Sequence, residues 1–303
     1  MRFLSIGLIV ALIPIAGASP IAEPSRPSIH HTETQAGSTA FEVFKGKLGL
    51  QLYSLRFEFK KNGVGPTLDW VRDHGFKALE GGGTYGLTRD EFLAELSKRG
   101  LKVVGTSATY EDLRDGKVDA AIENAKAYGA ESIMCAWIPH TGQLSAEVVK
   151  AAAGVFNRAG AQIKAAGLQF CYHPHGYEFV PTANGTLFDD LVAQTDQKNV
   201  GFELDVFWAK HGGQDPAKLL EKYPHRFQLM HLKDLQKGVV GNLTGQSPDE
   251  TSVALGTGQI DWPSVLRAAK KAGVKWYFIE EESPDAPRNI PESLAYLAGL
   301  RVK

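Results

Sequence analysis

Four apolar segments in the second half of the chain each lead to a side chain that could bind a metal ion or move a proton. The segments cover residues 168–172, 200–205, 227–231 and 274–280, and the side chains at their ends are His173, Asp205, His231 and Glu280. Imidazole and carboxylate groups together suit a divalent cation such as Mn, Co, Zn or Mg. Each residue alone has an ordinary explanation, as a helix cap or a buried core residue. Their joint occurrence at successive segment ends indicates a functional site.

Asp205, His231 and Glu280 are the predicted ligands of one divalent metal ion. If the segments are neighbouring strands, which lie roughly 5 Å apart, these three side chains can converge on one point. The fourth ligand would come from the residues that follow position 172. Glu178 could fold back over the site and is the first choice, and His173 is the alternative.

A partly overlapping set of side chains could carry out proton transfer. The predicted catalytic residues are Glu280, His173, His175 and Lys233. A carboxylate or an imidazole that lies beside a carbonyl compound can move the adjacent proton. Lys233 could neutralise a developing oxyanion or pair with its neighbour Asp234, and the sequence leaves these two roles open.

Other segment ends offer contacts to a substrate. The predicted substrate-binding residues are Glu80, Tyr53, Arg56, Trp137, His140, Trp208 and Glu282. Because side chains alternate along a strand, Glu282 is expected on the same face as Glu280. The aromatic members of this set could stack on the faces of a sugar, and part of the set could equally belong to the core.

The elements that position these residues alternate strictly from residue 46 onward. Strands are predicted at residues 48–54, 76–80, 101–106, 132–137, 168–172, 200–205, 227–231 and 274–280. Helices are predicted at residues 66–74, 88–99, 118–128, 145–166, 187–195, 215–223, 261–272 and 291–300. This alternation predicts an α/β fold with one domain over residues 46–303, the (β/α)8 TIM barrel, whose chemistry lies at the carboxyl ends of the strands. An open doubly wound sheet is the alternative, but no G-x-G-x-x-G motif follows the first strand.

One connection stands out by its length. Residues 235–255 follow the strand that ends in His231 and are rich in Gly, Ser and Thr. Long loops of this kind are often functional lids. We therefore predict that residues 235–255 form a mobile lid over the site.

The first 45 residues are expected to lie outside the barrel. Residues 1–18 resemble a secretory signal peptide, with Arg2, an apolar run at 3–15 and a small-residue cleavage site at 16–18. Residues 19–45 are rich in Ser, Pro, Thr and Glu and are predicted to be a flexible leader. These features predict a secreted or periplasmic protein with no stable membrane insertion once the signal is removed.

Composition excludes two classes of protein. The formal net charge is -1, so there is no basic excess that would indicate a nucleic acid partner. The two cysteines, Cys135 and Cys171, are too few for a disulfide scaffold. Each lies in an apolar run, so both are predicted to be buried free thiols.

Five motifs together resemble the sugar phosphate isomerase/epimerase family, which has a xylose isomerase-like TIM barrel. They lie at residues 172–179, 203–208, 231–234, 256–262 and 276–280. The resemblance implies a divalent metal, held by Glu, Asp, His and Glu at strand ends, that chelates a sugar carbonyl and the adjacent hydroxyl. Asp205, His231 and Glu280 match three of those positions. The chain departs from the family where members often carry a Glu after the fifth strand, and at Thr106–Ser107, where many carry a His.

The resemblance leads to a functional prediction with two alternatives. The prediction is a metal-dependent isomerase or epimerase that acts through an enediolate on a keto sugar. The first alternative is a lyase that cleaves the glycosidic bond of a 3-keto-glycoside by β-elimination, and the second is a non-catalytic sugar-binding protein. The export signal predicts a small, unphosphorylated saccharide as the partner. Nuclease members of the barrel family are disfavoured by the near-zero net charge.

Overall fold

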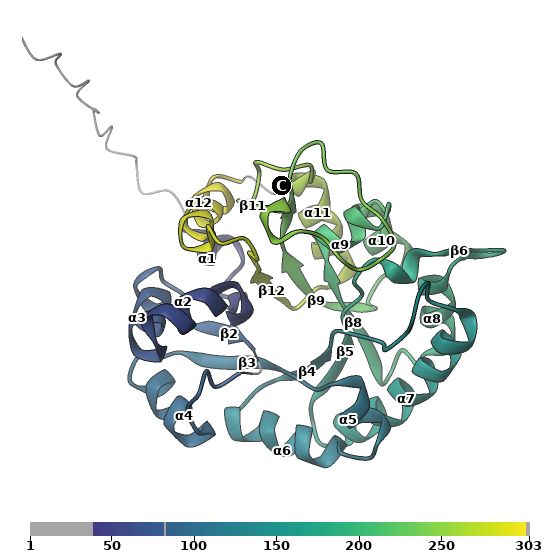
Figure 1. The fold of residues 1–303 in the computed structure, drawn as a ribbon, viewed down its shortest axis with the longest axis horizontal. Coiled ribbons are helices and arrows are strands. Elements are labelled where there is room, and N and C mark those ends of the chain that lie inside the picture. Colours follow the sequence, from purple (N-terminus) through teal and green to yellow (C-terminus); the bar gives the residue numbers. More distant parts are fainter. Residues whose placement is uncertain (1–38, 82, 301–303) are drawn as a thin grey trace, which may run out of the picture. The chain divides into compact units, whose positions relative to one another are not determined.

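Eight parallel strands close into a barrel in the computed structural model, which describes residues 39–81 and 83–300 (Figure 1). The strand order around the barrel is β1 (Leu48–Gln51), β12 (Trp276–Ile279), β9 (Phe227–Leu232), β8 (Val200–Asp205), β5 (Gln169–Tyr172), β4 (Ser132–Cys135), β3 (Lys102–Ser107) and β2 (Ala78–Glu80). The predicted (β/α)8 TIM barrel is therefore confirmed. The predicted signal peptide and most of the predicted leader lie outside the described residues.

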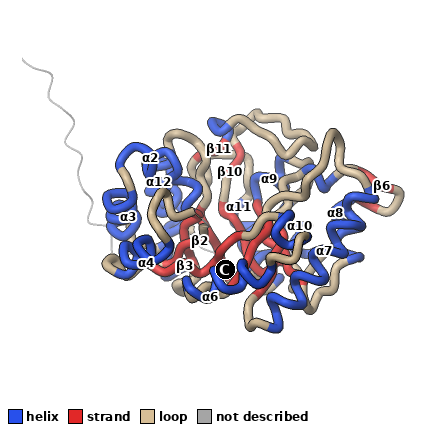
Figure 2. The backbone as a smooth tube through the Cα atoms, turned by 60° about the horizontal axis from the view of Figure 1, so that its bottom comes forward, coloured by secondary structure: helices blue, strands red, loops and turns tan. Residues whose placement is uncertain are grey.

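Helices surround the strands, as Figure 2 shows in blue around red. The eight predicted helices correspond to α3 (Val64–Asp73), α4 (Arg89–Ser97), α6 (Val118–Tyr128), α7 (Ala146–Ala165), α8 (Leu187–Gln194), α10 (Pro216–Lys222), α11 (Trp262–Ala272) and α12 (Ala286–Gly299). The capping box that begins α4 pairs Thr88 with Glu91. Only α12 begins well before its predicted start at Pro291, because Pro287 already occupies its first turn, where no backbone N–H is needed.

Four short helices were not predicted. They are α1 (Ala40–Val43), α2 (Arg56–Asn62), α5 (Tyr110–Arg114) and α9 (Val206–His211). The helix α1 lies within the predicted leader, yet it begins with a capping box between Thr39 and Glu42, and Ala40 is buried in the core. The packed body therefore begins before residue 46. None of the helices in the described part of the chain is long and apolar enough to cross a membrane.

The barrel interior is filled by side chains that leave the carboxyl ends of the strands free for polar groups. An apolar cluster from the inward faces of several strands comprises Ala78, Val104, Cys171, Leu229, Trp276 and Phe278. The cysteines are buried and free, as predicted. The 3-10 helix η1 (Leu52–Leu55) shortens the predicted first strand, since the Gln51 side chain accepts the Tyr53 N–H and begins a turn.

Two small hairpins project from the loops that follow the strands. One pairs β6 (Pro181–Thr182) with β7 (Gly185–Thr186), and the other pairs β10 (Asp234–Leu235) with β11 (Ser252–Val253). The 3-10 helix η3 (Asp249–Thr251) lies immediately before β11, the second strand of this hairpin. The predicted lid is thus a closed loop, 236–251, whose two ends are joined by a short antiparallel ladder.

Candidate metal and active site

A cavity of about 480 Å³ lies at the carboxyl ends of the barrel strands. Its lining comprises Gln51, Tyr53, Glu80, Gly81, Gly83, Tyr85, Thr106, Ser107, Met134, Ala136, His173, His175, His231, Glu280 and Glu282. These residues follow or end β1, β2, β3, β4, β5, β9 and β12, as expected for a barrel mouth.

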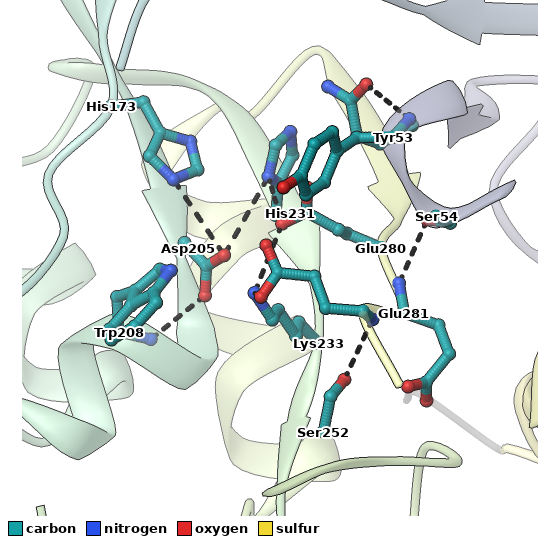
Figure 3. Close-up of polar contacts among 12 residues, drawn as sticks. Tyr53, Ser54, His173, Asp205, Trp208, His231, Lys233, Ser252, Glu280 and Glu281 are labelled. Carbon is teal, nitrogen blue, oxygen red and sulfur yellow. Dashed lines mark hydrogen bonds and ion pairs between the residues drawn. The ribbon is translucent and has the colours of Figure 1, made fainter. Parts of the chain in front are cut away.

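Three of the strand-end residues, His173, His231 and Glu280, line this cavity, and Asp205 faces them (Figure 3). Ligand-capable atoms of Asp205, His231 and Glu280 all lie within 4.8 Å of one another. His231 Nδ1 is 3.1 Å from Glu280 Oε2 and 3.8 Å from Asp205 Oδ2. His173 Nε2 is also 3.8 Å from Asp205 Oδ2. The predicted convergence of side chains from adjacent strands is therefore present in the structure.

The Asp205 carboxylate shows why this group fits a cation. Asp205 Oδ1 accepts the Trp208 N–H at 2.9 Å and so caps α9. Asp205 Oδ2 is buried without a hydrogen-bond partner and points between His173 and His231. A buried carboxylate oxygen without a partner carries a large desolvation cost. A divalent cation that also contacts the two histidines and Glu280 would offset that cost, and oxygen and nitrogen ligands in this mixture suit Zn, Mn or Co.

A second group of buried carboxylates lies on the other side of the histidines. Glu203 Oε2 is 3.3 Å from His173 Nδ1, and Glu203 Oε1 is 3.3 Å from His231 Nε2. Glu80 Oε2 is 2.6 Å from His231 Nε2 and accepts the Gln51 side-chain N–H at 2.8 Å. Glu80 was predicted to bind the substrate, and Glu203 was not among the predicted site residues. Period-two alternation could have found Glu203, because it lies two residues before Asp205 on the same strand.

The charges of this site act on the two histidines in opposite directions. Burial lowers the pKa of His173 to about 4, so this imidazole is neutral and can serve as a ligand. Burial alone would also lower the pKa of His231, but the negative charges of Glu203 and Glu280 outweigh it and hold the pKa well above its usual value. His231 therefore carries a positive charge among carboxylates, and a bound cation would replace its proton.

Glu178, the first choice for the fourth ligand, lies outside both groups of ligand-capable side chains. It is buried and accepts a hydrogen bond from the Tyr172 hydroxyl and from the His175 backbone N–H, the latter at 3.1 Å. Gly176, with φ of 92°, turns the chain between them. Of the two candidates for the fourth ligand, His173 and not Glu178 therefore lies beside Asp205.

His175 lies beside the ligand group without joining it. Its ring centroid is 4.7 Å from that of His173 and 5.2 Å from that of Trp208. Burial lowers the pKa of His175 to about 3, and its Nδ1 has no hydrogen-bond partner. This side chain lines the cavity as a neutral imidazole, which is the form that can accept a proton.

Lys233 pairs with carboxylates of β12 and not with Asp234. Its Nζ lies 2.7 Å from Glu282 Oε2 and 3.5 Å from Glu280 Oε2, and it contacts the rings of both Phe207 and Trp208. Asp234 instead accepts the Trp262 indole N–H at 2.8 Å and backbone N–H groups of the segment 256–260. The predicted alternative of a Lys233–Asp234 pair is therefore wrong, and Lys233 instead pairs with the two carboxylates that line the cavity, Glu280 and Glu282.

The predicted substrate-binding residues divide into two sets. Tyr53, Glu80 and Glu282 line the cavity. Trp137, His140, Trp208 and Arg56 lie outside its lining. Trp137 and His140 stack on each other with centroids 5.3 Å apart, and Trp208 is buried beside Lys233.

The loop 236–251 packs against several elements around the mouth. A β-carbon on Gly245 would lie 2.6 Å from the Tyr177 ring, so the loop backbone rests directly on that ring. Asp249, at the other end of the loop, pairs with the Arg56 guanidinium at 2.6 Å. Arg56 also donates to the Glu282 carbonyl oxygen at 2.8 Å, which joins the loop to the segment after β12. Mobility of this loop stays a prediction.

Comparisons with known proteins give one family. The sequence profile of the xylose isomerase-like TIM barrel family matches residues 68–300. The inosose dehydratase of Clostridium perfringens is 25% identical over 257 residues, which cover 76% of this chain and 85% of that protein. For the inosose dehydratases of Geobacillus kaustophilus and Clostridium beijerinckii, the chain spans 44% and 66% of their length, at 29% and 26% identity.

Solved structures show the same fold. A sugar phosphate isomerase/epimerase from Parabacteroides distasonis is 26% identical, with a TM-score of 0.70 over 90% of this chain and 98% of that one. The IolI protein, solved with a bound zinc atom, is 17% identical, with a TM-score of 0.64 over 83% of this chain and 95% of that one.

Proposed function

The chain belongs to the xylose isomerase-like TIM barrel family, and we propose that it is a divalent-metal-dependent enzyme that forms an enediolate on a keto sugar. The convergence of His173, Asp205, His231 and Glu280 around the unpartnered oxygen Asp205 Oδ2 is the observation that carries this proposal. These four residues would hold the metal. The names of the relatives support a carbohydrate substrate.

The chemistry requires a way to remove a weakly acidic proton. A cation held at the four ligands would polarise the substrate carbonyl and stabilise the negative charge that develops on its oxygen. Glu282, which follows β12, is the side chain beside the ligands that could move the proton, and His175 after β5 also lines the cavity. Burial and the charge of Glu280 raise the pKa of Glu282 in spite of the Lys233 ammonium, which makes this carboxylate a stronger base than an exposed one.

The positions of Glu282 and His175 suit a reaction with two proton transfers. The strands β12 and β5 lie on either side of β9 and β8, which supply His231 and Asp205. Glu282 could remove the proton beside the carbonyl and deliver it to a second carbon or to a leaving group, while His175, whose pKa is lowered to about 3, could only hydrogen-bond the substrate on the other side. The same pair therefore serves isomerisation, epimerisation and elimination.

Among these outcomes we place elimination first. The curated relatives, one of which aligns over 85% of its length, are dehydratases, and a dehydratase eliminates water. Isomerisation or epimerisation is the second candidate, favoured by the name of the Parabacteroides distasonis structure. In either case we propose an unphosphorylated saccharide and a secreted or periplasmic location, supported by the signal-peptide pattern of residues 1–18. Identification of the N-terminal residue of the mature protein would test the cleavage.

A substitution at Asp205 tests the metal site. Asp205→Asn keeps an oxygen that can accept the Trp208 N–H, so α9 keeps its cap, but the variant loses the charge. We expect loss of the bound metal and of activity. Asp261→Asn is the matched control, because Asp261 caps α11 in the same way outside the cavity. Full metal occupancy in Asp205→Asn would contradict the site.

Deuterium incorporation tests the reaction. The purified protein, supplied with Mn or Co, is incubated in D2O with free and 3-keto saccharides. If an enediolate forms, deuterium should appear at the carbon beside the carbonyl. Loss of water or of a glycosidic group from the substrate would identify the enzyme as a lyase. A product that keeps all its substituents would identify it as an isomerase or epimerase. Turnover with neither deuterium incorporation nor a primary isotope effect at that carbon would refute the mechanism. Metal binding without turnover of any saccharide would favour a sugar-binding protein.

A further inference from the structure

Each histidine of the candidate metal site lies between two sets of carboxylates. His231 directs Nδ1 toward Glu280 and Asp205, at 3.1 and 3.8 Å, on the cavity side. Its other nitrogen, Nε2, faces Glu80 at 2.6 Å and Glu203 at 3.3 Å. The two ring nitrogens of His231 are therefore assigned to different partners.

His173 is placed in the same manner but with its nitrogens exchanged. Its Nε2 faces Asp205 Oδ2 at 3.8 Å, and its Nδ1 faces Glu203 Oε2 at 3.3 Å. Glu203 thus contacts both histidines, one with each carboxylate oxygen. The Glu203 side chain is fully buried, and the structure shows no other polar partner for it among the described residues.

We propose that Glu80 and Glu203 are positioning residues, which accept the N–H groups of His231 and His173 and so direct the opposite nitrogens, His231 Nδ1 and His173 Nε2, toward the cation. A neutral imidazole has one N–H group and one lone pair, so a partner that holds the N–H also decides where the lone pair points. The inference rests on the proposed function only in that it assumes a bound cation; it requires no particular substrate.

The surroundings of Glu80 support this role over direct contact with a substrate. The Gln51 side chain donates to the same oxygen, Glu80 Oε2, that lies against His231. Gln51 is in turn held because its own oxygen accepts the Tyr53 backbone N–H. A β-carbon on Gly105 would lie 2.7 Å from Glu80 Oε1, so the carboxylate lies directly against the backbone of β3 and would have to shift if a larger residue stood there. Glu80 is consequently fixed from three strands.

Metal affinity provides the first test. Glu80→Gln and Glu203→Gln keep the shape of the side chain but remove the negative charge that faces the histidine N–H group, and Glu203→Gln also replaces one of the two oxygens that face the histidines by an NH2 donor. Removing partners of this kind typically weakens metal binding by about 10–100-fold, and we expect that range for the Co²⁺ dissociation constant, with a changed visible spectrum of the bound Co²⁺. Glu281→Gln is the matched control, since Glu281 is equally buried but accepts from Ser283 and Asn289, so its affinity should stay within about twofold of the wild type.

Histidine tautomers provide the second test and need no variant. In the Zn²⁺-loaded wild-type protein, ¹⁵N NMR should find the proton of His231 on Nε2 and the proton of His173 on Nδ1. A His231 proton on Nδ1 would place the cation in the group formed by His173, Glu203 and His231 and would overturn the proposal, as would a wild-type protein that binds neither Co²⁺ nor Zn²⁺.

The two tests separate this inference from the proposed function. Equal Co²⁺ affinities in Glu203→Gln, Glu80→Gln and the wild type would refute the positioning role even if the enzyme turned over a saccharide. Weakened affinity and the expected tautomers would uphold the positioning role even if no saccharide were turned over.

Discussion

Replacing Glu178 by Gln is expected to remove a pH-dependent loss of stability. The Glu178 carboxyl group is fully buried and accepts from the Tyr172 hydroxyl and from the His175 backbone N–H. Burial raises its pKa from 4.5 to about 7, although the hydrogen bond from Tyr172 offsets part of the effect. The folded protein therefore binds this proton more tightly than the unfolded chain does.

The sign and size of the effect follow from linkage. Because the folded-state pKa is the higher one, the stabilisation is complete below the unfolded-state pKa of 4.5 and is lost as the pH rises through about 7. A tenfold difference in proton affinity is worth about 1.4 kcal/mol, so the whole loss amounts to about 3 kcal/mol. Roughly 2 kcal/mol of it falls between pH 5 and pH 8.

Urea unfolding of the wild type and Glu178→Gln at both pH values measures this loss. The amide still offers an oxygen to the Tyr172 hydroxyl and cannot ionise, so the variant should gain about 2 kcal/mol relative to the wild type between pH 5 and pH 8. Glu123→Gln serves as the control, since the Glu123 side chain is 78% exposed and its replacement should act equally at both pH values. A constant difference between Glu178→Gln and the wild type would refute the reasoning. Loss of bound metal in this variant would instead show that Glu178 is a ligand.

Three further outcomes are expected. Arg56→Gln and Asp249→Asn should each release the loop 236–251, which would appear as faster hydrogen exchange in that loop and as a changed KM or kcat. The stability cost should stay below about 1 kcal/mol, because the Asp249 side chain is 44% exposed. Unchanged exchange and kinetics would contradict the lid. Lys233→Met should leave two buried carboxylates, Glu280 and Glu282, without the Lys233 ammonium that pairs with them. The free energy of unfolding in urea should fall by about 3–5 kcal/mol, and a fall of less than about 1 kcal/mol would show that the ion pair is unimportant. Chelation should lower Tm, and restoring free metal to about 100 times its Kd should return about 2.7 kcal/mol; an unchanged Tm would argue against a resident cation.

Sequence periodicity was sufficient to predict the barrel and to predict that Asp205, His231 and Glu280 lie close together. Alternating strands and helices require parallel strands, and parallel strands bring their carboxyl ends to one mouth. Asp205, His231 and Glu280 could therefore be assigned from their places at strand ends, before any side-chain contact was known. Short helices such as α9 escaped because a single turn has no apolar period of its own.

Residues beyond a strand end follow no such rule, and there only the tertiary structure decided. The turn at Gly176 leads Glu178 to the Tyr172 hydroxyl and away from the ligands, and no local pattern distinguishes that course from a return over the mouth. The same holds across the barrel for the contact of Glu80 on β2 with His231 on β9, which no register of adjacent strands predicts. The sequence by itself determined which strand ends carry side chains that could bind a metal, because backbone periodicity sets the face and the end of each strand. Which carboxylates face Asp205 and which ones contact the histidines from the other side depends on packing between distant residues, and packing is a property of the folded chain alone.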